Sequence, residues 1–288
     1  MIDVCDIRQI QALLERHGFH FSKAKGQNFL TAGWVPEQLA AQAGLDSGCG
    51  VLEVGPGIGP LTRQLCRRAG KVVAVELDRR LAPLLEETMA GFDNLALVFA
   101  DVLKTDLRAL TEEKLPGLRL HACANLPYYI TSPVLTRLLE SRLFDAVTVM
   151  VQKEVAQRIC AAPGTSEYGA FSVFCQYHAA PQLLFDVPPD CFVPRPKVTS
   201  AVLTLPRRTE PVCALTDEAL FFRVVRASFA MRRKTLANGL AAGFPQLGKA
   251  ALCGLLENCG LSPEVRGETL GIPEFAAVAN AIAARGEA

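Results

Sequence analysis

The sequence predicts an α/β fold in which helices cover both faces of a parallel sheet, followed by a small all-helical C-terminal domain. Apolar runs alternate with helix-like stretches through the first half of the chain, and no strand-like run follows Arg208. The apolar runs are nearly continuous, which is typical of parallel strands because helices bury both faces of such a sheet. With 288 residues, half of them apolar, the chain is long enough for one large core and a smaller second domain.

Five apolar runs predict the parallel strands. The first opens segment 50–59, and the others are residues 71–78, 95–101, 120–126 and 146–152. Apolar residues at helical spacing after the first two strands predict connecting helices, the first of them at residues 60–69. Two further strands, 181–187 and 200–205, are joined by a proline-rich link and are predicted to form an antiparallel pair at the sheet edge.

Helical patterns dominate the rest of the chain. They cover residues 221–230, 235–242, 250–259 and 275–284. We therefore predict a boundary near residue 210, with the α/β domain at residues 1–210 and the helical domain at residues 211–288.

The composition excludes several classes of protein. The chain is too apolar for intrinsic disorder, and no run reaches the ~18–20 apolar residues of a membrane span. The first residues lack the layout of a secretion signal or a transit peptide. The ten cysteines contain no C-x-x-C pair and the four histidines are scattered, which disfavours a disulfide scaffold and a zinc module. We therefore expect a soluble cytoplasmic protein without a metal. The composition carries no information on the oligomeric state, for which a monomer is the default expectation.

The charge is unevenly distributed along the chain. Residues 195–249 carry ten Lys and Arg but only three Asp and Glu, whereas the segments before and after each have a net charge of −3. A local excess of this size is typical of contact with a polyanion such as a nucleic acid. A solvated basic helix face would give the same pattern, so charge alone leaves both interpretations open.

Three strand ends carry groups that could surround an adenosine. A G-x-G-x-G turn at residues 55–59 follows the first strand, and its glycines let the backbone approach a ligand closely. Glu76 ends the second strand, where a carboxylate can accept both ribose hydroxyls, and Asp101 ends the third, where it can accept from an adenine amine. These groups favour S-adenosylmethionine, with a dinucleotide as the alternative. Glu76 could also be an ordinary surface glutamate.

The fourth strand ends in Asn125-Leu126-Pro127-Tyr128, and this segment indicates a reaction. The exocyclic amine of adenine is a poor nucleophile because its lone pair is delocalised into the ring. The Asn125 side chain and a backbone carbonyl beside Pro127 can accept its two N–H bonds and turn the lone pair toward a sulfonium methyl group. Tyr128 offers a face on which a flipped base can stack. The same residues could also form an ordinary turn.

The chain resembles the ribosomal RNA adenine dimethyltransferases from about Ile10 to Ile282. The segments that carry the resemblance include the glycine turn, GQNFL (26–30), VAVELD (73–78), NLPYYITSP (125–133), VQKEVAQRI (151–159), FVPRPKVTSAV (192–202) and FAMRRKTLANGL (229–240). The tetrapeptide NLPY together with FVPRPKV is highly specific, whereas the glycine turn alone is not. Within the family, the chain is most similar to bacterial enzymes that dimethylate two adjacent adenosines in the hairpin near the 3′ end of 16S ribosomal RNA.

The resemblance implies a Rossmann-like S-adenosylmethionine-dependent methyltransferase sheet, with a loop and helix in residues 1–48 covering the cofactor. The cofactor-binding residues that it implies are Gln27, Asn28, Leu30, Gly55, Gly57, Glu76, Asp101 and Asn125. The catalytic residues that it implies are Asn125, Leu126, Pro127, Tyr128 and Phe192. In this assignment Phe192 stacks the target base opposite Tyr128, whereas its sequence context alone favours core packing.

Basic residues in two segments are expected to contact the RNA backbone, because Lys and Arg neutralise phosphates while RNA shape and loop bases give specificity. Arg195 and Lys197 lie in the proline-rich link. The others follow residue 210 and are Arg223, Arg226, Arg232, Arg233 and Lys234. The aromatic residues among them, Phe221, Phe222 and Phe229, are expected to belong to the helix core.

Two residues depart from the family pattern. Lys25 stands before Gly26 where an apolar residue is expected, and Ala100 stands before Asp101 where Gly is usual. Ala100 fits unless its backbone requires a positive φ, which is costly for alanine. Neither departure involves the NLPY segment.

Together these features predict S-adenosylmethionine-dependent N6,N6-dimethylation of two adjacent adenosines of 16S ribosomal RNA, in a precursor of the small (30S) ribosomal subunit, and a role in subunit biogenesis. Three alternatives stay open. A 23S ribosomal RNA dimethyltransferase that confers antibiotic resistance shares the fold. A non-catalytic ribosome assembly factor could retain it, although the intact Glu76, Asp101 and Asn125 argue against lost chemistry. A DNA adenine methyltransferase is disfavoured because such enzymes usually need a larger recognition element.

Overall fold

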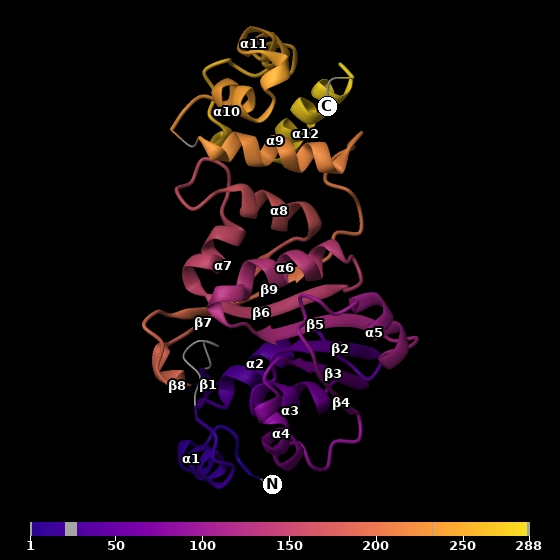
Figure 1. Ribbon diagram of the computed structural model, residues 1–288, viewed down its shortest axis with the longest axis vertical. Coiled ribbons are helices and arrows are strands. Elements are labelled where there is room, and N and C mark those ends of the chain that lie inside the picture. Colours follow the sequence, from indigo (N-terminus) through magenta and orange to yellow (C-terminus); the bar gives the residue numbers. More distant parts are fainter. Residues whose placement is uncertain (1, 21–27, 232, 287–288) are drawn as a thin grey trace. The chain divides into compact units, whose positions relative to one another are not determined.

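A computed structural model of the chain describes residues 2–20, 28–231 and 233–286 (Figure 1). These residues form two compact units. Unit 1 comprises Met1–Ala156 and Pro181–Arg207, and unit 2 comprises Gln157–Ala180 and Arg208–Ala288.

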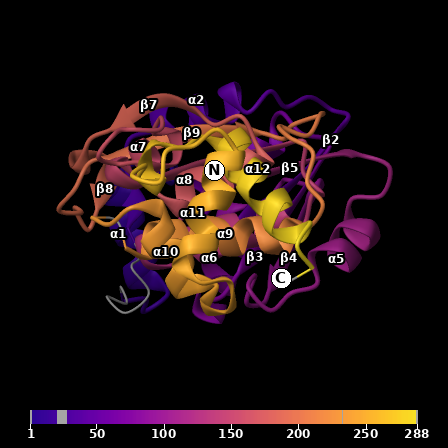
Figure 2. The same ribbon diagram turned by 90° about the horizontal axis from the view of Figure 1, so that it is seen from above.

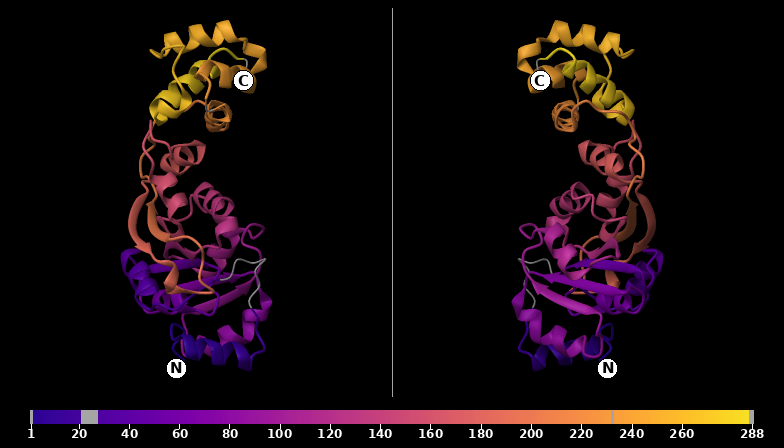
Figure 3. Two further views of the ribbon diagram at one scale, coloured as in Figure 1. Left: turned by 90° about the vertical axis from the view of Figure 1, so that its left-hand side faces the viewer. Right: turned by 90° about the vertical axis from the view of Figure 1, so that its right-hand side faces the viewer.

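Unit 1 is built on a seven-stranded sheet in the order β4-β3-β2-β5-β6-β9-β7. Its strands are β2 (Cys49–Val54), β3 (Lys71–Glu76), β4 (Leu95–Phe99), β5 (Arg119–Asn125), β6 (Ala146–Gln152), β7 (Gln182–Val187) and β9 (Ser200–Pro206). The strands from β4 to β6 in this order pair in parallel, and β9 pairs antiparallel with both β6 and β7. Figure 3 shows β7 and β9 running side by side. The predicted parallel strands and the antiparallel edge pair are therefore confirmed.

Both faces of this sheet are covered. All six residues of β2 are buried, and successive side chains of a strand point to opposite faces, so neither face is open at that strand. On one face, Val51 and Val72 belong to an apolar cluster that also holds Leu39 and Leu65 from two helices. The helices of or bordering this unit are α1 (Ile7–Arg16), α2 (Trp34–Gln42), α3 (Pro60–Cys66), α4 (Ala82–Thr88), α5 (Leu107–Lys114), α6 (Thr131–Glu140) and α7 (Lys153–Cys160).

A second, two-stranded sheet joins segments that are far apart in the sequence. The strands β1 (Phe29–Leu30) and β8 (Phe192–Val193) pair antiparallel, with Leu30 opposite Phe192. The pairing is extended by the Thr31 amide, which donates to the Cys191 carbonyl at 2.8 Å. The N-terminal segment is thereby fixed beside the proline-rich link that follows β7.

Unit 2 is helical. Its helices are α8 (Ala170–His178), α9 (Glu218–Ala230), α10 (Leu236–Gly243), α11 (Lys249–Asn258) and α12 (Ile272–Ala283), several of which are labelled in Figure 2. None of the described residues after Pro206 belongs to a strand, and the four predicted C-terminal helices are present. Among the residues that the structure describes, no helix is both long and apolar enough to cross a membrane.

The division of the chain differs from the contiguous domains predicted at residues 1–210 and 211–288. Gln157–Ala180 belongs to unit 2, although it lies between β6 and β7 in the sequence. Aromatic packing explains this: the Tyr177 ring centroid lies 5.2 Å from that of Phe221, and the Tyr168 hydroxyl donates to the Leu270 carbonyl at 2.9 Å. Sequence periodicity does not identify this partner, because the apolar face of α8 could pack on either core.

Candidate active site

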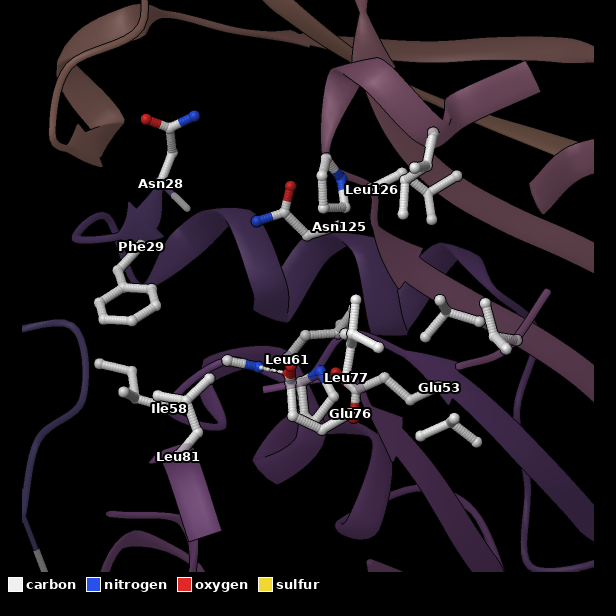
Figure 4. Close-up of a pocket in the computed structure, with 18 of the residues that line it drawn as sticks. Asn28, Phe29, Glu53, Ile58, Leu61, Glu76, Leu77, Leu81, Asn125 and Leu126 are labelled. Atoms are coloured by element: carbon white, nitrogen blue, oxygen red, sulfur yellow. Dashed lines mark hydrogen bonds between the residues drawn. The ribbon is translucent and has the colours of Figure 1, made fainter. Parts of the chain in front are cut away.

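A cavity of about 320 Å³ lies in unit 1 at the carboxyl ends of the parallel strands (Figure 4). Every residue predicted from the sequence to bind the cofactor or the target base lines it, as far as the structure describes them. These residues are Asn28, Leu30, Gly55, Gly57, Glu76, Asp101, Asn125, Leu126, Pro127, Tyr128 and Phe192. Gln27 and Lys25 lie outside the described residues. The tertiary structure thus brings six separate chain segments to one cavity.

The glycine turn has a backbone that other residues would adopt only with strain. Gly55, Gly57 and Gly59 have φ values of 71°, 62° and 90°, in the left-handed region that favours glycine. A Cβ atom at Gly59 would lie 2.7 Å from the Sδ atom of Met89, whereas at Gly55 it would meet no atom within 4 Å. A side chain at position 59 would be strained by the backbone and would displace the Met89 side chain, whereas Gly55 leaves open space beside the cavity.

The Glu76 carboxylate is buried and oriented by the backbone. Its Oε1 atom accepts from the Asp78 amide at 2.8 Å and its Oε2 atom accepts from the Gly57 amide at 3.3 Å. Burial raises the pKa of Glu76, and these two hydrogen bonds oppose that shift. The carboxylate is therefore fixed against the glycine turn while keeping acceptor capacity for a ligand.

Asp101 follows β4 and is only partly buried. Its Oδ1 atom accepts from the Leu103 amide at 3.0 Å, and the Lys104 ammonium lies 3.9 Å from Oδ2. The residue before it, Ala100, does not have a positive φ, since Arg142 is the one described non-glycine residue that does. Alanine therefore fits where the family usually has glycine.

Glu53 is a third carboxyl group in the cavity lining, and no role was predicted for it. Burial raises its pKa to about 8, and the nearby charge of Glu76 adds to the shift. Its Oε2 atom has no hydrogen-bond partner among the described residues. At neutral pH the group is mainly a protonated acid, because the charged form is disfavoured in this environment.

The segment after β5 holds two hydrogen-bond acceptors. The Asn125 side chain makes no hydrogen bond with any other described residue, and it projects into the cavity in Figure 4. The Pro127 carbonyl already accepts from the Ile130 amide at 3.1 Å. Among the described backbone hydrogen bonds outside helices and strands, none is accepted by the Leu126 carbonyl, which makes it the candidate for the backbone acceptor predicted beside Pro127.

The two aromatic residues predicted to hold the target base, Tyr128 and Phe192, both line the cavity. The Tyr128 hydroxyl and the Ser200 hydroxyl are 2.7 Å apart, which anchors the ring to β9. Burial raises the pKa of Tyr128, so it remains a neutral phenol. Phe192 is buried in the same apolar cluster as Phe29 and Leu30 and also lines the cavity. The core and binding interpretations of Phe192 are thus compatible.

The basic residues differ in their surroundings. Arg195 and Lys197 in unit 1 are exposed, as are Arg226, Arg233 and Lys234 in unit 2. Arg223 donates from Nη2 to the Gly243 carbonyl at 3.0 Å, and its guanidinium carbon lies 4.3 Å from the Phe244 ring centroid. Arg232 lies outside the described residues. As predicted, the aromatic residues of α9 contribute to the core of unit 2: Phe221, Phe222 and Phe229.

Among the cavity-lining side chains without a predicted role are Phe29, Leu77, Val102 and Tyr129. Each is adjacent in sequence to a residue for which a role was predicted. The position of the last three next to strand ends could have indicated them, because residues at the carboxyl ends of parallel strands share one edge of the sheet. What the sequence does not show is which neighbour points into the cavity.

The chain is similar to proteins of one family. The family described as "Ribosomal RNA adenine dimethylase" matches residues 18–276. The protein named ribosomal RNA small subunit methyltransferase A of Bacillus mycoides is 46% identical over 287 residues, which cover 98% of each chain.

Two solved structures are also similar. A dimethyladenosine transferase from Plasmodium falciparum superposes with a TM-score of 0.78 at 25% identity, covering 90% of this chain and 98% of that one. The 23S ribosomal RNA methyltransferase ErmE superposes with a TM-score of 0.66 at 26% identity, covering 88% and 99%. With most of its length matched and the predicted residues gathered at one cavity, this chain belongs to the ribosomal RNA adenine dimethylase family.

Proposed function

We propose that this chain is an S-adenosylmethionine-dependent methyltransferase that dimethylates the N6 atoms of two adjacent adenosines in the 3′-terminal hairpin of 16S ribosomal RNA. It would act in the cytoplasm, as a monomer and without a metal, on a precursor of the small ribosomal subunit. The observation that supports this most directly is the Asn125–Tyr128 segment, which lines one cavity together with Glu76, Asp101 and Phe192. The 46% identity to a small subunit methyltransferase favours that subunit as the substrate.

The cavity residues fit S-adenosylmethionine. The volume of about 320 Å³ lies in the range of pockets that hold cofactor-sized ligands, ~300–1,000 Å³. Glu76 would accept from the ribose hydroxyls and Asp101 from the adenine amine, while Asn28 and Leu30 would contact the methionine end. The open space beside Gly55 leaves room for a close backbone approach. When bound, the cofactor would supply an electrophilic methyl group on a sulfonium.

The chain's own residues would contribute orientation. The Asn125 Oδ1 atom and the Leu126 carbonyl accept the two N–H bonds of the target amine, which directs its lone pair out of conjugation with the ring. No strong base is needed, because the proton becomes acidic once the new N–C bond has formed and can then leave to water. Tyr128 and Phe192 provide the apolar faces that hold the flipped base.

The second methyl transfer to the same nitrogen requires a rearrangement. After the first transfer only one N–H bond remains, so the amine must rotate and the methyl group must occupy space near one acceptor. We expect Asn125 to hold the remaining N–H bond, since its side chain is the more adjustable of the two acceptors. A cavity with room beside Asn125 and Tyr128 is a condition of this step.

A 23S ribosomal RNA substrate is the second candidate, because the 23S enzyme ErmE shares the fold over 88% of this chain. The two candidates differ in the subunit that is methylated. Neither the cavity nor the exposed basic residues distinguishes them, because both reactions need the same base pocket.

The test is methyl transfer from labelled S-adenosylmethionine to unmethylated small subunits, with large subunits and naked 16S RNA in parallel. Nucleosides are then separated and identified by mass. We expect N6,N6-dimethyladenosine on small subunits alone. Label on large-subunit RNA would support the second candidate, and small-subunit binding without any label would indicate a non-catalytic assembly factor.

A further inference from the structure

Tyr129 is an exposed aromatic side chain at the candidate active site. Of the six large apolar side chains that are exposed among the described residues, two line the cavity: Leu77 is 54% exposed and Tyr129 is 57% exposed. Leu77 follows Glu76 and lies on the cofactor side. Tyr129 follows Tyr128, so it is the exposed apolar group on the side of the target base.

The local backbone separates the two neighbouring tyrosines. Tyr128–Ile130 forms a single 3₁₀ turn, η3, that leads into α6. A 3₁₀ helix has about three residues per turn, so successive side chains diverge by roughly 120°. Tyr128 is anchored by its hydrogen bond to Ser200. Tyr129 therefore cannot stack on the same base as Tyr128 and presents its ring to another group.

In the proposed reaction, the nucleotide next to the flipped base is left without a stacking partner. When a base is flipped into a protein pocket, the nucleotide next to it loses a stacking neighbour. A protein aromatic ring can replace that neighbour, and base–aromatic stacking is strong enough to matter for binding. Here the neighbour is itself an adenine, which has a large ring for stacking.

We propose that Tyr129 stacks on the nucleotide adjacent to the adenosine undergoing methylation, and so helps to select a pair of adjacent purines. This inference rests on the proposed function. Stacking requires only the exposed aromatic ring of Tyr129 and does not involve its hydroxyl. Tyr129→Phe should therefore behave like the wild type, whereas Tyr129→Ala should not.

The test combines a protein variant with an RNA change. Small subunits are reconstituted with 16S RNA in which one adenosine of the pair is abasic, the 5′ and 3′ positions in separate samples, and methyl transfer to the other adenosine is measured. The proteins are the wild type, Tyr129→Phe, Tyr129→Ala and the control Leu183→Ala. Leu183 on β7 is 45% exposed and does not line the cavity. The affinity for S-adenosylmethionine is measured for each protein.

We expect Tyr129→Ala to lower kcat/KM about ten-fold on intact subunits with unchanged cofactor affinity, and Leu183→Ala to have no effect. The kcat/KM of the wild type should be about ten-fold lower on at least one abasic substrate than on intact subunits. The kcat/KM of Tyr129→Ala should not fall further on that substrate. The stacking role would be overturned if the loss of kcat/KM caused by Tyr129→Ala and the loss caused by the abasic position multiply. It would also be overturned if Tyr129→Phe is as defective as Tyr129→Ala. If the wild type fails to methylate intact small subunits, the proposed function itself is wrong.

Discussion

The polar side chains that line the cavity of unit 1 differ from the basic side chains of unit 2 in how firmly the protein holds them. In the cavity, Glu76 accepts from two backbone amides, Asp101 from one, and Tyr128 is hydrogen-bonded to Ser200. In unit 2, Arg226, Arg233 and Lys234 are exposed to solvent.

This contrast follows from what each region is proposed to do. Orienting an amine toward a methyl group requires the methyl donor and the base to be held at fixed positions, and an error of an ångström is costly. Attracting a polyanion requires only charge near the surface, because its energy varies slowly with distance. Changes in the cavity should therefore affect one step strongly, and changes among the basic residues should be small and similar to one another.

The largest effect is expected for Asn125→Ala. Removing one positioned acceptor should lower kcat ~10²–10³-fold, while the affinity for small subunits stays within about two-fold because the basic residues are untouched. Single-turnover methyl transfer and subunit binding measure the two quantities separately. Undiminished turnover would refute the role of Asn125. An equally large loss of affinity for small subunits would contradict the division of roles between the two regions.

A smaller effect is expected from the buried acid Glu53. Its pKa is raised from 4.5 to about 8 in the folded chain, so the folded state binds one more proton than the unfolded state between these values. Stability is therefore lost as the pH rises through that window, by about 2 kcal/mol between pH 6 and pH 8. Glu53→Gln cannot ionise and should lack this loss.

Urea unfolding at the two pH values measures the difference between Glu53→Gln and the wild type. Glu112→Gln is the control, because Glu112 is exposed in α5. If Glu53→Gln loses as much stability as the wild type between pH 6 and pH 8, Glu53 is not a buried neutral acid.

The smallest effects are expected for single basic residues of unit 2. Arg226→Ala should weaken subunit binding by ~1 kcal/mol and lower the slope of log affinity against log salt by about 1, with the melting temperature unchanged. Arg223→Ala should also lower the melting temperature, because Arg223 bonds the Gly243 carbonyl and lies over Phe244. A salt slope that does not change in Arg226→Ala would remove that residue from the RNA contact.

The α/β class, the succession of strands and helices along the chain and three polar residues of the cavity can be predicted from the sequence alone. The ends of the strands can be recognised in the sequence because apolar runs stop where polar residues begin. In parallel strands these ends lie at one edge of the sheet. Glu76, Asp101 and Asn125 could be identified for this reason. Asn28, Leu30 and Phe192 could be identified only through the family resemblance, because no local pattern marks a loop as facing a ligand.

The remaining features depend on contacts that form only in the folded chain. The assignment of Gln157–Ala180 to unit 2 depends on which aromatic side chains pack together, and the sequence specifies the apolar face but not its partner. The protonation of Glu53 depends on its burial, which is a property of the assembled core. The exposure of Tyr129 beside the half-buried Tyr128 depends on the single 3₁₀ turn that follows β5, because that turn sets the direction of each ring.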